Sequence, residues 1–168
     1  MDAPERADAS SSPSVSLYLR AEKIALRLIA RAEQCSAGLA RKLEKRKCDP
    51  EAINEVLSLL TEKKLIDDNR FARFWLQSRL RFARSPRRLL SSLCARGIDR
   101  DDAESALKEV LNEETEQALL ARFVKKYARK INKKKDSENE DTMRSLKFLL
   151  KNEGFSTAAI RQFLEDEE

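Results

Sequence analysis

The sequence predicts an all-α protein that is built from three tandem three-helix repeats. Of its 168 residues, 38% are charged and only three are Gly and four Pro, a composition typical of soluble helical chains. Apolar residues recur three and four positions apart along most of the chain, which is the spacing of amphipathic helices. One set also recurs at a constant offset of 50 positions: Leu39, Leu43, Asp49 and Leu57 are followed by Leu89, Leu93, Asp99 and Leu107.

The first repeat is predicted over residues 17–66. Helical spacing indicates an amphipathic helix over 17–31 and a second over 36–46. Asp49 and Pro50 predict the start of a third helix, because an aspartate can accept free amide protons and a proline needs no amide partner in a first turn. The apolar face of this helix is formed by Ile53, Val56, Leu57 and Leu60.

The second repeat is predicted over residues 67–113 and opens with a helix over about 68–82. Adjacent carboxylates can cap that helix and an apolar stripe follows; these residues are Asp67, Asp68, Phe71, Trp75 and Phe82. The Ser85-Pro86 pair predicts the next helix start. Gly97 predicts its end, since a left-handed C-terminal cap favours glycine, and Asp99 caps the last helix.

The third repeat is predicted over residues 114–164, at an offset of 57 from the second. Its matching positions are Leu146, Leu150, Gly154, Ser156, Ile160 and Leu164. Its extra length lies in a charged, solvated insertion over 132–141. The N-terminal segment 1–16 and the acidic segment 165–168 are expected to be disordered tails. Because each repeat is too small to bury its apolar face alone, the three should stack into an elongated, curved modular body.

The composition argues against catalysis and metal binding. The chain has no histidine, and Cys35, Cys48 and Cys94 show no Cys-x-x-Cys spacing, so neither a zinc site nor a Cys-His or Ser-His nucleophile pair is expected. Adjacent acids at a helix start are far more often caps than metal ligands. No apolar run approaches a membrane span. We therefore expect a cytoplasmic, non-enzymatic protein with reduced thiols, no metal and no cofactor.

Basic residues are concentrated locally although the net charge of the chain is only +5. Clusters of Lys and Arg on helices are the footprint of phosphate-backbone binding, and the competing interpretation for any one cluster is a solvated face. The candidate contact residues of the second repeat are Arg79, Arg81, Arg84, Arg87, Arg88 and Arg96. Those of the first are Lys42, Lys45 and Arg46, and those of the third are Lys125, Lys126, Arg129 and Lys130.

A long segment around the second repeat resembles the central signature of the bacterial RecX family, which regulates the RecA recombinase. The segment runs from Leu65-Ile66-Asp67-Asp68-Asn69-Arg70-Phe71-Ala72 through Ser78-Arg79 to Ser85-Pro86-Arg87-Arg88, and continues in Leu93-Cys94-Ala95-Arg96-Gly97-Ile98-Asp99. The residues taken as its structural signature are Asp67, Asp68, Arg70, Phe71, Pro86, Gly97 and Gly154. The resemblance covers about residues 24–164.

The resemblance implies a regulator, mainly an inhibitor, that lies in the groove of the RecA filament on DNA. Such a protein modulates the ATPase, strand-exchange and coprotease activities of RecA. The sequence departs from the usual family pattern at Ala83 and Ser85, where glycines are common, and at Asn152 and Glu153, where basic residues are usual.

The implied partners are the RecA filament and single- or double-stranded DNA, bound without sequence preference by a monomer. The basic residues could contact phosphate, an acidic recombinase surface or both. A transcriptional regulator is a rival interpretation, and such a protein would prefer a DNA sequence and dimerise. The chain could also be a general DNA-binding helical protein or a protein-binding helical scaffold. A steep salt dependence would favour phosphate contacts.

Overall fold

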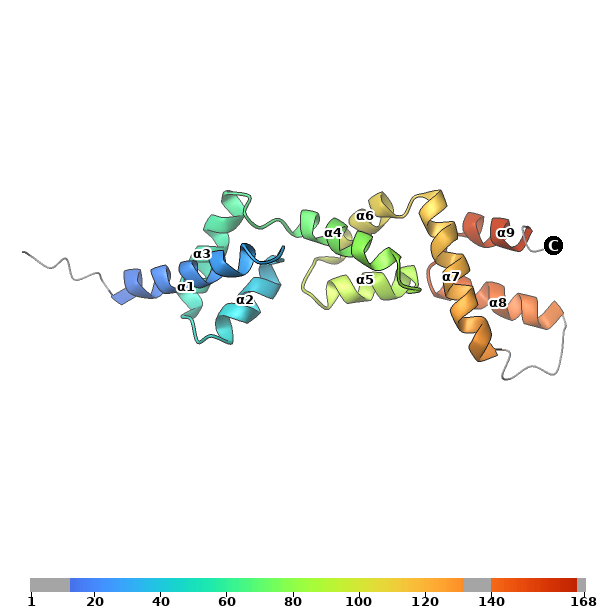
Figure 1. The fold of residues 1–168 in the computed structure, drawn as a ribbon, viewed down its shortest axis with the longest axis horizontal. Helices are drawn as coiled ribbons and strands as arrows, with labels where there is room; N and C mark the ends of the chain where they lie inside the picture. Colours follow the sequence, from blue (N-terminus) through green and yellow to red (C-terminus); the bar gives the residue numbers. More distant parts are fainter. Residues whose placement is uncertain (1–12, 132–139, 166–168) are drawn as a thin grey trace, which may run out of the picture. The chain divides into compact units, whose positions relative to one another are not determined.

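The computed structural model describes residues 13–131 and 140–165, and within these ranges it contains nine α-helices and no strand. The all-α prediction is confirmed. The chain forms two compact units, one ending at Asp67 and one beginning at Asp68. The helices, coloured along the chain in Figure 1, are α1 Pro13–Ile29, α2 Ser36–Glu44, α3 Pro50–Glu62, α4 Asp68–Leu80, α5 Pro86–Cys94, α6 Arg100–Val110, α7 Glu113–Ile131, α8 Glu140–Asn152 and α9 Thr157–Glu165.

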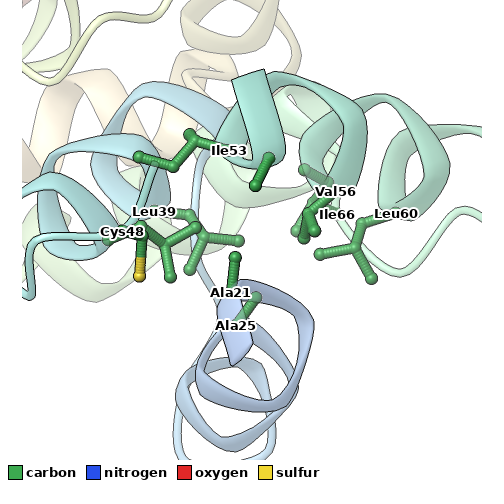
Figure 2. Close-up of a cluster of buried hydrophobic side chains, with 10 residues drawn as sticks. Ala21, Ala25, Leu39, Cys48, Ile53, Val56, Leu60 and Ile66 are labelled. Atoms are coloured by element: carbon green, nitrogen blue, oxygen red, sulfur yellow. The ribbon is translucent and has the colours of Figure 1, made fainter. Parts of the chain in front are cut away.

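The first unit is a three-helix bundle of α1, α2 and α3. Figure 2 shows its core, where Ala21 and Ala25 on α1 face larger apolar side chains from the other two helices. Leu39, Val56 and Leu60 are almost completely buried in this cluster. Because alanine projects only a methyl group, α1 can approach the leucines of α2 and α3 closely.

The start of α1 differs from the sequence prediction. Residues 1–12 of the predicted tail lie outside the described residues, but the helix begins at Pro13 and not at Leu17. Proline suits the first turn because that turn has no intrahelical partner for an amide proton. The side chain of Val15 is exposed, so the core-facing spacing that marks a buried helix is missing before Leu17.

A shared turn ends the second helix of every repeat, which supports the offsets of 50 and 57. The residues with positive φ in this turn are Lys47 (57°), Gly97 (91°) and Gly154 (86°). The amides of Cys48, Ile98 and Phe155 donate to the carbonyls of Leu43, Leu93 and Leu150 at 3.2, 3.3 and 3.2 Å. This is the bonding pattern of a Schellman cap, which satisfies carbonyls left free at a helix end.

The predicted caps at Asp49, Ser85 and Asp99 are confirmed. Asp49 Oδ1 accepts from the amides of Glu51 and Ala52 at 3.0 and 3.1 Å. Asp99 Oδ1 accepts from the amide of Asp101 at 2.9 Å, and Ser85 Oγ from the amide of Arg88 at 3.4 Å. Each cap satisfies backbone donors that the helix itself leaves free.

Removing the Asp49 cap should destabilise the first unit modestly. We expect Asp49→Ala to lower the free energy of unfolding by about 1 kcal/mol, because two first-turn amides lose their acceptor. Asp49→Ser should cost much less, since serine also caps. Urea unfolding followed by circular dichroism measures the difference, and equal stabilities of the two variants would contradict a capping role.

The charged insertion predicted over 132–141 is only partly described. Residues 132–139 lie outside the described residues, and α8 begins at Glu140, so the last two positions of the predicted insertion are helical. At the C-terminus α9 ends at Glu165, and residues 166–168 lie outside the described part. The repeat boundaries and the elongated, curved arrangement stay predictions.

Candidate binding surface

Three arginines of the second repeat, two near the end of α4 and one after α5, stack on aromatic rings. The guanidinium carbons of Arg96 and Arg79 lie 4.5 and 5.5 Å from the centre of the Trp75 ring. Those of Arg79 and Arg81 lie 5.8 and 5.0 Å from the centre of the Phe82 ring. At these distances a cation is attracted to the ring face, by about 0.5–1 kcal/mol at exposed sites. Three of the predicted contact arginines are thus positioned by two rings.

Phe82 is not part of the apolar core, and its placement in the predicted stripe was wrong. It follows the end of α4 at Leu80 and is 43% exposed, whereas Trp75 is only 9% exposed. The helix stops before the stripe reaches Phe82, and arginine side chains flank its ring. Phe82 therefore lies at the surface among arginine side chains.

A concavity of about 420 Å³ lies between the α4–α5 loop, α5 and α7. Its lining residues are Ala83, Arg84, Arg88, Ser91, Ser92 and Lys126. Arg84 comes from the loop, Arg88 from α5 and Lys126 from α7, so three cations from separate segments converge. The fold thereby joins a residue of the predicted third-repeat cluster to the arginines of the second repeat.

The start of α5 is joined to the end of α8. The amide of Arg87 donates to the carbonyl of Glu153 at 3.0 Å, and its Nη1 donates to the carbonyl of Asn152 at 3.2 Å. The hydroxyl of fully buried Ser85 donates to the carboxylate of Glu153, and Arg88 Nε lies 3.9 Å from the same carboxylate. We call this set of contacts the α5–α8 joint. It gives Arg87 and Arg88 a structural role in addition to any contact with a partner.

The other predicted basic residues are spread over both units. In the first unit Lys42, Lys45 and Arg46 are exposed near the end of α2, and Arg46 Nη1 donates to the carbonyl of Lys42 at 2.8 Å. Lys125 is exposed on α7. The side chains of Arg129 and Lys130 lie outside the described part of α7.

Equivalent positions of the three repeats make contacts that were not predicted from the sequence. Arg96 Nη1 donates to the carbonyl of Ser92 at 2.8 Å, the same contact that Arg46 makes fifty positions earlier. The equivalent residue of the third repeat is Glu153, which joins α5 instead. Arg122 was not among the candidate contact residues; its Nη1 donates to the carbonyl of Leu80 at 3.0 Å. The unusual acid at position 153 was visible in the sequence, but the contact of Glu153 with α5 was not predicted.

The signature residues lie mainly at turns and helix starts. Asp67, Asp68, Arg70 and Phe71 are half-buried around the beginning of α4, and Pro86 is buried at the first position of α5. Gly97 and Gly154 occupy the shared positive-φ turn. Among the residues that the structure describes, no group of three His, Cys, Asp or Glu could hold a metal ion. No helix in the described part of the chain is long and apolar enough to cross a bilayer.

Two profiles of known domains match the chain: "RecX, first three-helix domain" over residues 21–60 and "RecX, second three-helix domain" over residues 67–107. The regulatory protein RecX of Halorhodospira halophila is 33% identical over 138 residues, which cover 82% of this chain and 81% of that protein. The chain belongs to the RecX family. The RecX protein of Treponema pallidum (strain Nichols) is 37% identical over 111 residues, covering 66% of this chain and 68% of the relative.

Solved RecX structures share the fold. The crystal structure of RecX from Lactobacillus salivarius has a TM-score of 0.69 at 19% identity, covering 90% of this chain and 96% of that one. A second RecX crystal structure has a TM-score of 0.75 at 18% identity, covering 90% and 73%. Membership of the family confirms the resemblance to RecX that the sequence shows. The chain is a non-enzymatic regulatory protein of the RecA recombinase.

Proposed function

We propose that this RecX protein binds the RecA filament on DNA as a cytoplasmic monomer and inhibits its ATPase, strand-exchange and coprotease activities. The proposal rests on one observation: several arginines of the second repeat lack a carboxylate partner within the described part of the chain, and two of these are held by aromatic rings. Arg79, Arg81, Arg84 and Arg87 have no carboxylate within ion-pair distance among the described residues. Two of them are nevertheless held in place by the rings of Trp75 and Phe82.

Positioned but unneutralised cations favour an external anionic partner. Their positive charge is not cancelled within the protein, so it attracts phosphate or acidic protein surface and speeds association. Guanidinium groups held against rings also lose less side-chain freedom on binding than free ones do. A DNA-bearing filament offers both kinds of anion, and DNA contacts of this kind are indifferent to base sequence.

Hydrolysis of ATP by the cognate RecA on single-stranded DNA tests the proposal directly. With this protein titrated in at substoichiometric amounts, we expect hydrolysis to fall. A parallel measurement without RecA shows how much DNA the protein covers alone. Inhibition at concentrations where little DNA is covered supports regulation through the filament. Unchanged hydrolysis would overturn the inhibitory function.

A further inference from the structure

We propose that the concavity lined by Arg84, Arg88 and Lys126 is a subsite for a phosphate group of a nucleic-acid backbone. The proposal deepens the proposed function and rests on its claim that the basic surface binds an anion. It assigns DNA phosphate, and not an acidic surface of the recombinase, to this part of the surface.

The three cations are arranged for an anion that offers several oxygen atoms. The side chains of Arg84 and Lys126 are exposed and form no hydrogen bond or ion pair with another described residue. Arg88 makes only a long contact, 3.9 Å, to Glu153, which leaves most of its guanidinium donors available. A phosphate accepts from several directions at once, and guanidinium forks bind it through paired hydrogen bonds.

The lining of the concavity is too polar to receive the apolar side chain by which a protein partner is usually anchored. Ser91 and Ser92 supply hydroxyl groups, and Ser92 Oγ donates to the carbonyl of Arg88 at 2.7 Å, while Ala83 is the single apolar residue. Anchors at protein interfaces are mostly aromatic or aliphatic side chains in apolar pockets. By contrast, a concavity between α8 and α9 includes Ile160 and Leu164 in its lining.

The helix pair around the α4–α5 loop does not itself require the charges of Arg84 and Arg88, although Arg88 also contacts Glu153. In the first repeat the positions equivalent to Arg84 and Arg88 are Gln34 and Gly38, and the same helix pair forms there without them. Gln34 is buried and donates to the carbonyl of Ala32, whereas Arg84 is exposed. Because the same helix pair forms there with no cation at either of these two positions, the charges at 84 and 88 are not needed to build it, which favours a ligand.

Charge reversal with a matched control tests the subsite. The test variant is Arg84→Glu with Lys126→Glu, and the control is Lys23→Glu with Lys108→Glu, two exposed residues outside the concavity that change the net charge equally. The probe is a fluorescein-labelled oligothymidylate, and anisotropy gives its affinity over a range of NaCl concentrations. Circular dichroism verifies that both variants are folded.

We expect the test variant to bind about tenfold more weakly than wild type near 0.1 M salt. The slope of log affinity against log salt should become shallower by about 0.7 for one lost contact to a phosphate of a single strand, while the control keeps the wild-type slope. An equal loss in both variants, or wild-type affinity in the test variant, overturns the subsite.

A second variant acts in the opposite direction. Glu153→Gln keeps an oxygen that can accept from Ser85 but removes the negative charge beside Arg88. We expect it to tighten binding of the same probe about twofold, the size of an exposed ion-pair contribution. Unchanged or weaker binding by this folded variant counts against Arg88 as a ligand of the phosphate.

The RecA assay separates this proposal from the proposed function. If wild-type protein leaves RecA hydrolysis unchanged but the DNA results hold, the inhibitory function fails and the subsite stands. If wild type inhibits RecA and the Arg84→Glu, Lys126→Glu variant keeps full DNA binding while losing inhibition, the concavity receives an acidic surface of the recombinase. That second result overturns the assignment of phosphate.

Discussion

Replacing Arg87 and Arg88 together by glutamate is expected to remove inhibition of the RecA ATPase. Both side chains are exposed on the first turn of α5, next to the Arg84 loop. The double change turns two attractions for an anionic partner into repulsions, and like charges facing each other at an interface cost several kcal/mol. The concentration for half-inhibition should therefore rise at least about tenfold, which corresponds to about 1.4 kcal/mol.

The helical content of this variant should stay close to that of wild type, although the bond of Arg87 to the Asn152 carbonyl and the contact of Arg88 with Glu153 are lost. Acidic residues are favourable in a first helical turn, and a glutamate at position 88 would stand three residues after the Ser85 cap, as in a capping box. The Lys23→Glu, Lys108→Glu variant controls for net charge. Full inhibition by the folded Arg87→Glu, Arg88→Glu protein would show that these arginines do not contact the filament.

The fold could be predicted from the sequence because its information is local and repeated. Leu43, Leu93 and Leu150 mark the same buried position of a helix end, and all three accept the same backbone hydrogen bond. Asp49 and Asp99 carry an equally local signal, since a cap acts on amides two and three residues away. The part of α1 before Leu17 was missed because Val15 is exposed and adds no core-facing position.

The binding surface could be predicted only as a set of charged residues. Arginine has no sequence signature that tells a side chain stacked on a ring from one that donates to a distant carbonyl. Arg79 and Arg87 are such a pair, since one stacks on Trp75 and the other bonds to Asn152. The convergence of Lys126 with Arg84 depends on how α7 packs on the second repeat, which no local pattern records.

We expect Gly154→Ala to lower the free energy of unfolding more than Gly97→Ala does. The reason is that alanine at position 154 also disturbs the α5–α8 joint. Both glycines have positive φ, 86° and 91°, in the shared turn. A non-glycine residue in this region costs about 1–2 kcal/mol, and that cost applies to both variants. At Gly154 a Cβ would also lie 3.3 Å from the backbone nitrogen of Arg87, and 3.6 Å from the Cβ atoms of Arg87 and Pro86.

The extra crowding at position 154 affects a hydrogen bond that joins α5 to the end of α8. To make room, α8 and α5 must separate slightly, which stretches the 3.0 Å hydrogen bond from the Arg87 amide to the Glu153 carbonyl. Weakening of that bond adds up to about 1 kcal/mol, so Gly154→Ala should lower the free energy of unfolding more than Gly97→Ala does. Urea unfolding, followed by circular dichroism and by the fluorescence of the single tryptophan, Trp75, measures both variants.

The same pair of variants connects the joint to binding. The concavity needs Lys126 of α7 beside Arg84 and Arg88, and α7 packs on α9, which follows α8 directly. If the joint holds that arrangement, Gly154→Ala should weaken oligothymidylate binding under conditions where it is still folded, whereas Gly97→Ala should not. If the two variants have equal stabilities and equal affinities, the α5–α8 joint does not position the cations. Each repeat then positions its own cations.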